Sequence, residues 1–161
     1  MTCIAYRNGV LAADSQETDG NNIKTPCQKL FRIAKGKNRG HIVGTQGASF
    51  SGMVFVDWYS GDRPEMPSSE RDLIDGDDGF GILILTPQGL YEADKSCRPV
   101  PVSAPFYAVG DGAGIAIGAM EMGASAKQAV QAACKHNIYC SGPVIAMRLA
   151  PLPARAPRAR R

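Results

Sequence analysis

The sequence contains no run of eighteen apolar residues, no Cys-x-x-Cys pair and only two histidines, His41 and His136. A helix that crosses a bilayer needs about 20 apolar residues, so we expect no membrane contact. We recognise no secretory signal, and five cysteines without a Cys-x-x-Cys pair are best explained as free thiols in a reducing cytoplasm. Two isolated histidines predict no metal site, and nothing in the sequence indicates another cofactor.

Basic residues outnumber acidic ones, giving a formal net charge of +3, but the excess lies in one short segment. Residues 151–161 contain four arginines and no acid, and they have no apolar period. We expect this tail to be disordered and residues 1–150 to form a single domain. Without the four arginines the formal charge would be about −1, so we expect no nucleic-acid partner.

Turn-forming residues are frequent, with 18 glycines and 11 prolines, and they separate short apolar segments. Apolar residues flank Asn8-Gly9, which is the strongest short signal for a β-hairpin. A polar turn is expected at 17–22. Further strands are expected at 29–34, 41–45, 79–86, 90–94, 100–102, 105–109 and 144–149, and helices from Ser49 to near Gly61, at 113–122 and at 126–136. This order predicts an α+β fold, a four-layer α/β/β/α sandwich of two antiparallel sheets flanked by helices.

The second residue of the chain is Thr2. If Met1 is removed, the chain begins with a hydroxyl nucleophile that carries its own free α-amine. Such an amine has a pKa of about 7.7–8.0, so part of it is neutral near pH 7. It can then act as the general base for its own hydroxyl.

Several short motifs, in their order along the chain, resemble the proteasome β-subunit and HslV peptidase family of N-terminal nucleophile hydrolases. These motifs lie at Thr2–Ile4, Ala12–Asp14, Gln28–Leu30, Gly44–Gly47, Val109–Gly112, Gly118–Met120 and Ser141–Pro143. The resemblance extends from Thr2 to about Leu149. It implies a threonine-type endopeptidase that forms a homo-oligomeric, self-compartmentalised ring, acts on peptides or unfolded proteins, and can have an ATP-dependent unfoldase as a partner.

The resemblance also implies four catalytic roles. Thr2 is the nucleophile, Lys29 is the cation beside it, Asp14 holds Lys29, and the backbone N–H of Gly47 donates to the oxyanion. A cation near the hydroxyl favours its deprotonation. In an ideal hairpin Asp14 lies opposite Cys3, facing away from Thr2, so a bulge or a twist at the strand end has to bring it into the site.

Three positions at the edge of the expected site differ from the family. Asp111 stands where the family commonly has Ser, Asn137 where it has Asp, and Cys140 where it has Ser or Thr. Asp111 can accept a hydrogen bond from the terminal ammonium, but its charge can also raise the pKa of that amine. Asn137 cannot ionise, and Cys140 is a weak donor. Cys3 is expected to be a core thiol.

Two other functions stay open beside the threonine peptidase. The three substitutions and a first hairpin about four residues shorter than in the family motivate a catalytically inactive ring or scaffold subunit. The third possibility is an N-terminal nucleophile amidohydrolase that acts on a small amide. Retention of Met1 would favour the scaffold, whereas amide turnover without peptide turnover would favour the amidohydrolase.

Overall fold

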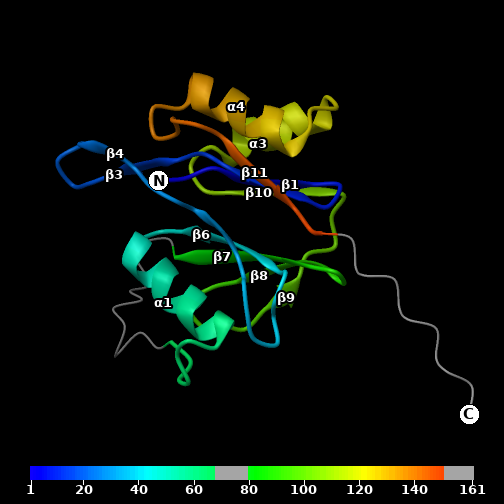
Figure 1. Ribbon diagram of the computed structural model, residues 1–161. Coiled ribbons are helices and arrows are strands. Elements are labelled where there is room, and N and C mark those ends of the chain that lie inside the picture. The colour runs from blue at the N-terminus through cyan, green and yellow to red at the C-terminus, as the bar shows by residue number, and fades with distance from the viewer. Residues whose placement is uncertain (68–79, 151–161) are drawn as a thin grey trace, which may run out of the picture.

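A computed structural model of the chain describes residues 1–67 and 80–150. The predicted disordered tail at 151–161 lies outside these residues. The described part contains eleven strands and three helices (Figure 1). Among its helices, none has both the length and the apolar character that a bilayer crossing requires.

The first hairpin forms where the sequence predicts it. Strands β1 (Ile4–Arg7) and β2 (Val10–Ala13) pair antiparallel in a regular register. Asn8 and Gly9 both have positive φ, 50° and 74°, as a type I′ turn requires. The hairpin forms the centre of a four-stranded sheet of order β10-β1-β2-β11, completed by β10 (Phe106–Val109) and β11 (Ile145–Arg148).

A second antiparallel sheet has five strands in the order of the chain. It consists of β5 (Leu30–Arg32), β6 (Ile42–Gln46), β7 (Gly81–Thr86), β8 (Gly89–Ala93) and β9 (Val100–Pro101). All six residues of β7 are buried. This agrees with the continuous apolar sequence of that strand, because a strand covered on both faces has no polar side.

The end of α1 and the start of α4 lie at residues that suit helix termini. Helix α1 (Ser49–Ser60) stops at Gly61, which has a φ of 86°. Helix α3 (Ala113–Glu121) follows the Gly110–Gly112 turn. Helix α4 (Ala126–His136) starts with a capping box, in which the Ser125 hydroxyl accepts from the Gln128 N–H and the Gln128 side chain accepts from the Ser125 N–H.

Three groups of buried side chains hold these elements together. The first lies between the two sheets, with Ile4 and Leu11 from the four-stranded sheet against Leu83 and Leu85 of β7. The second packs α3 and α4 on the outer face of the four-stranded sheet. The third packs α1, through Phe55, on the outer face of the five-stranded sheet. Figure 1 shows α3 and α4 at one end of the molecule and α1 at the other.

The region predicted as a polar turn at 17–22 is in part a strand. Strand β3 (Gln16–Thr18) pairs with β4 (Lys24–Pro26), and Asp19 closes a tighter turn by accepting from the N–H groups of Asn21 and Ile23. Strand propensity is weak in this polar sequence, so the sequence pattern did not reveal the hairpin. It stands out from the rest of the fold (Figure 1), and it forms one wall of the site described below.

The predicted fold class is confirmed as a mixed α and β structure with antiparallel sheets and three described helices.

Candidate active site

Thr2 lies two residues before the start of β1 and is 2% exposed. The turn between β10 and α3 holds it in place. Gly112 donates its N–H to the carbonyl oxygen of Thr2 at 3.2 Å. At Gly110, with φ +89°, a Cβ atom would lie 2.2 Å from that same oxygen. Glycine is therefore required at position 110 both by the backbone conformation and by the close approach of Thr2.

Asp111, between the two glycines, binds the backbone on both sides of the Met1–Thr2 bond. Its Oδ2 accepts from the Thr2 N–H at 3.1 Å and lies 3.4 Å from the α-ammonium of Met1. The Asp111 side chain is 41% exposed, so solvent screens this ion pair. Asp111 would be the direct partner of a terminal amine at Thr2.

Lys29 and Asp14 form a buried ion pair beside Thr2. The Lys29 Nζ lies 2.8 Å from Asp14 Oδ1, with Lys29 5% and Asp14 1% exposed. The Asp14 carboxylate also accepts the N–H of Cys3 at 2.9 Å and that of Gln16 at 3.0 Å. Three donors satisfy the buried carboxylate, which in turn fixes the position of the ammonium.

Asp14 reaches the site without a bulge. The β1–β2 ladder is regular up to the Ile4–Ala13 pair, and Asp14 still donates its N–H to the Cys3 carbonyl at 3.1 Å. The chain leaves the strand at this point, so the Asp14 side chain turns back onto the backbone of Cys3. Either a bulge or a twist at the strand end was expected to bring Asp14 into the site. The structure has no bulge in this ladder, and Asp14 reaches the site from the end of the strand.

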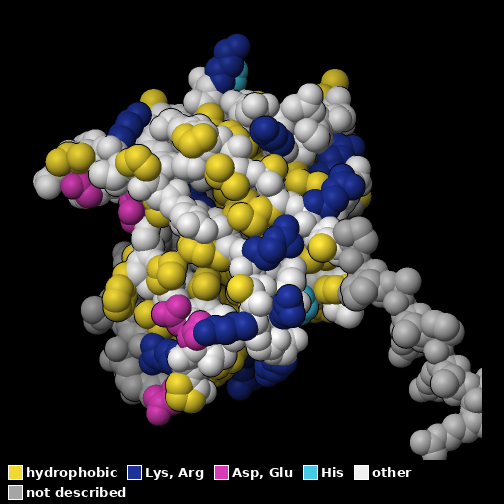
Figure 2. Space-filling model, viewed as in Figure 1, with side chains coloured by type: hydrophobic (Ala, Val, Ile, Leu, Met, Phe, Trp, Pro, Cys, Tyr) yellow, Lys and Arg dark blue, Asp and Glu magenta, His cyan; other side chains and the backbone are white. Residues whose placement is uncertain are grey.

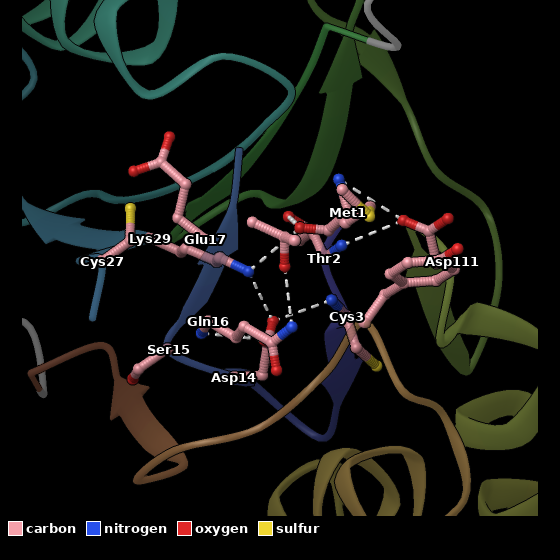
Figure 3. A network of polar contacts seen from close by, with 12 residues as sticks. Met1, Thr2, Cys3, Asp14, Ser15, Gln16, Glu17, Cys27, Lys29 and Asp111 are labelled. Atoms are coloured by element: carbon pink, nitrogen blue, oxygen red, sulfur yellow. Dashed lines mark hydrogen bonds and ion pairs between the residues drawn. The ribbon is translucent and has the colours of Figure 1, made fainter. Parts of the chain in front are cut away.

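The carbonyl oxygen of Met1 is the point where two donors of the site meet. The hydroxyl of Thr2 donates to it at 2.5 Å, and Lys29 Nζ donates to it at 3.3 Å (Figure 3). The Thr2 hydroxyl and the Lys29 ammonium therefore both point into the same small volume. While Met1 is attached, its carbonyl fills that volume and the nitrogen of Thr2 is an amide, which is not a base.

A cavity of about 340 Å³ opens in front of Thr2. Gly47, which follows β6 and has a φ of 90°, lines this cavity together with Lys29 and Thr2. Its backbone therefore lies on the same cavity as the hydroxyl and the ammonium. The four residues for which the family resemblance implies catalytic roles, Thr2, Asp14, Lys29 and Gly47, lie together in the structure.

The three positions that differ from the family all lie near the Asp111 turn. Asn137 donates from Nδ2 to the backbone carbonyl of Asp111 at 2.9 Å and accepts the N–H of Tyr139 at 2.8 Å. Its amide joins the turn to the segment after α4. Cys140 is 1% exposed, and a Cβ atom at Gly112 would lie 2.9 Å from its Sγ.

The cysteine next to Thr2 is a neutral core thiol. Its hydrogen bond with Cys140, together with burial, raises the pKa of Cys3 far above its usual range. Figure 3 shows the Cys3 sulfur pointing away from Thr2, and the residue is fully buried among the side chains below α3 and α4. A thiol that is not ionised is a poor nucleophile, so Cys3 does not compete with Thr2.

The outer wall of the cavity consists of residues that the sequence pattern did not reveal. This wall is formed by hairpin β3–β4, the end of β6 and the start of α1, through Gln16, Glu17, Thr18, Cys27, Thr45, Ala48 and Ser49. Gln16 and Glu17 follow Asp14 by two and three residues, and this closeness in sequence was the available signal. Within residues 1–67 and 80–150, no cluster of His, Cys, Asp and Glu has the composition of a metal site.

No known protein-family profile matches the sequence, and no curated protein does. Solved structures do match. BPH from Thiobacillus denitrificans in complex with epoxomicin has a TM-score of 0.64 and 20% identity, covering 93% of this chain and 99% of that chain. BPH of the same organism in another structure gives 0.64 and 21%, covering 93% and 98%. Eukaryotic HslV from Trypanosoma brucei gives 0.63 and 16%, covering 91% and 97%.

These matches confirm the resemblance as a likeness of fold. The superposition covers more than nine-tenths of this chain and of each compared structure. The chain therefore has an HslV-like fold. Identities of 16–21% are too low to transfer the chemistry of one chain to another.

Proposed function

We propose that the chain is a threonine-type endopeptidase subunit of the proteasome and HslV type, with Thr2 as its N-terminal nucleophile once Met1 is removed. One observation carries the proposal: the buried Lys29–Asp14 pair and the Thr2 hydroxyl are directed at the same point, beside a cavity that Gly47 also lines. Burying an ion pair is costly. Lys29 of this pair donates to the same Met1 carbonyl as the Thr2 hydroxyl, and this contact supports a catalytic role for the pair.

Removal of Met1 activates the site in two ways. It frees the Thr2 nitrogen as an amine, and it empties the volume in which the Met1 carbonyl had met the hydroxyl and Lys29. The positive charge of Lys29 then favours the ionised hydroxyl and the neutral amine. The carbonyl of a substrate occupies the emptied volume.

The reaction balances with groups of this chain and one water. The α-amine takes the proton of the Thr2 hydroxyl as Oγ bonds to the peptide carbonyl carbon. The N–H of Gly47 donates to the resulting oxyanion, a contact worth about 10²–10³ in rate. The amine passes the proton to the leaving nitrogen, the C–N bond breaks, and an ester remains on Thr2. Water, deprotonated by the same amine, then hydrolyses the ester.

The HslV-like fold supports a ring of identical copies, and the surface of α1 fits such an assembly. On this helix Phe50 is 66% exposed and Met53 is 41% exposed, and a neighbouring copy would cover both side chains. An unfoldase partner and a cytoplasmic location belong to the same proposal. We also infer that residues 1–150 are one domain, and that the three core regions make it a four-layer α/β/β/α sandwich.

Asp111 is the specific observation that favours an inactive ring subunit instead. Its carboxylate lies 3.1 Å from the Thr2 nitrogen, so it stabilises the protonated form of a terminal amine and weakens it as a base. The partly exposed position of Asp111 reduces this effect by solvent screening. For this reason we rank the active peptidase first.

Intact mass and peptide turnover of the purified native protein test the proposal together. We expect the mature chain to begin at Thr2 and to cleave short fluorogenic peptides. Thr2→Ala should reduce turnover to background without changing the oligomer size measured by light scattering. Thr2→Ser is the matched control, because it keeps a hydroxyl and should retain activity. Retained Met1 with no turnover would favour the scaffold, and wild-type turnover by Thr2→Ala would refute the mechanism.

A further inference from the structure

The cavity in front of Thr2 carries one carboxylate, that of Glu17. Glu17 lies in β3, and its Oε1 accepts the hydroxyl of Ser49 at 2.5 Å. Ser49 is the first residue of α1, and its hydroxyl also contacts the Cys27 thiol at 3.1 Å. The carboxylate is thus held at the wall of the cavity by a side chain from the opposite element.

The cations of the site already have partners of opposite charge. Lys29 pairs with Asp14 at 2.8 Å, and the terminal ammonium lies 3.4 Å from Asp111. Glu17, in contrast, forms no ion pair within the described part of the chain. Figure 3 shows its carboxylate turned away from the Lys29 ammonium and toward Cys27, so the negative charge faces the other end of the cavity.

We propose that Glu17 makes this cavity a binding site for a positively charged side chain, Arg or Lys, on the residue whose carbonyl Thr2 attacks. The inference rests on the proposed peptidase function and names its substrate class. Gly47, the expected oxyanion donor, and Glu17 line the same cavity. A residue whose carbonyl is bound at Gly47 therefore has the Glu17 carboxylate in the cavity that receives its side chain.

Size and charge both fit this occupant. The volume of about 340 Å³ is at the low end of the range of about 300–1,000 Å³ for ligand pockets, enough for one long side chain. A guanidinium or ammonium that binds Glu17 forms a charge-assisted hydrogen bond, about twice as strong as a neutral one. On the face shown in Figure 2, acidic side chains lie at hairpin β3–β4 and below it with Lys and Arg side chains among them, so the preference for a cation rests on Glu17 itself and not on a wider acidic surface.

Glu17 could instead serve only to stabilise the start of α1, where a negative charge is favourable. The two roles differ in what removal of the charge does. A structural role alters turnover of every substrate equally. A specificity role alters only the preference for a cationic substrate.

Paired peptides that end in Arg or in citrulline before the cleaved bond separate these roles, because citrulline has the shape of arginine without its charge. We expect the mature protein to show kcat/KM at least about tenfold higher for the Arg peptide. Glu17→Gln should bring this ratio close to one while leaving kcat/KM for the citrulline peptide within about twofold. Glu121→Gln, which removes an exposed carboxylate at the end of α3, is the matched control and should keep the ratio.

Binding to the Thr2→Ala variant keeps the inference testable without turnover. We expect an uncleaved peptide amide that ends in Arg to bind at least about tenfold tighter than its citrulline counterpart in calorimetry, and Glu17→Gln to abolish the difference. Equal affinity of the two peptides, or an equal loss for both substrates in Glu17→Gln, would overturn the role of Glu17. Absence of all peptide turnover by the mature protein would overturn only the peptidase function.

Discussion

Replacing Lys29 by Met is the most informative single change, because it acts on both stability and activity. Met has a similar length and no charge, so it fills the space of the lysine stem. The change leaves Asp14, which is 1% exposed, without its ammonium partner at 2.8 Å. The carboxylate keeps two donors, the N–H groups of Cys3 and Gln16.

The cost to stability follows from these contacts. Removing one partner of a buried ion pair typically costs about 3–5 kcal/mol, because the other charge stays buried and unpaired. Two remaining N–H donors place Lys29→Met near the lower limit, at about 3 kcal/mol. With an m-value of about 2 kcal/mol/M, the midpoint of urea unfolding should fall by about 1.5 M. Adding Asp14→Asn to the same protein removes the buried charge and should recover part of the loss.

The effect on activity should be larger than the effect on folding. Without the ammonium, neither the ionised hydroxyl nor the neutral amine of Thr2 is favoured, and we expect kcat/KM for peptides to fall about 10²–10⁴-fold. The assay is run well below the unfolding midpoint of the variant, so that all the protein is folded. The Asp14→Asn, Lys29→Met double variant should regain stability but no activity.

Two results would refute this reasoning. A free energy of unfolding within about 0.5 kcal/mol of wild type would mean that the carboxylate does not depend on Lys29. Peptide turnover at the wild-type rate by folded Lys29→Met would mean that the ammonium takes no part in the chemistry.

Two further predictions test the surroundings of the site. Gly110→Ala should destabilise the protein by at least about 2 kcal/mol in urea unfolding, because a Cβ atom there meets the backbone oxygen of Thr2 at 2.2 Å. Gly114→Ala in α3, with open space around it, should instead stabilise the protein by about 0.5–1 kcal/mol. Equal effects of the two changes would contradict the requirement for glycine at position 110. Iodoacetamide at pH 7.5 should label Cys27 first, since the other cysteines are buried or, at Cys134, have a pKa that burial raises to about 11. The first adduct detected by mass should coincide with loss of peptide turnover, because Cys27 lines the cavity. Early labelling of another cysteine would contradict the described packing.

Much of the fold could be read from local signals in the sequence. The turn at Asn8-Gly9, the start of α4 at Ser125 and the end of α1 at Gly61 all lie where residue types predict them. Each of these depends on the conformational preferences of a few neighbouring residues. The hairpin β3–β4 was missed because its polar sequence carries no apolar alternation, and its pairing depends on the neighbouring parts of the fold.

For the candidate site, the sequence supplied the chemical groups but not their geometry. Hairpin register alone placed Asp14 on the wrong face, and the strand end brings it back to Cys3 and Lys29. Glu17 could not be recognised as part of a cavity. Its position there depends on Ser49, thirty-two residues further along the chain.

The sequence by itself determined which residues can do chemistry and where the strands and helices lie, with the exception of hairpin β3–β4, since both follow from side chains and their near neighbours. Only the tertiary structure decided that Thr2, Lys29 and Asp14 meet at one point and that Glu17 faces the same cavity without a cation of its own among the described residues. The reason is physical: the positions and energies of buried charges depend on which distant parts of the chain exclude water around them.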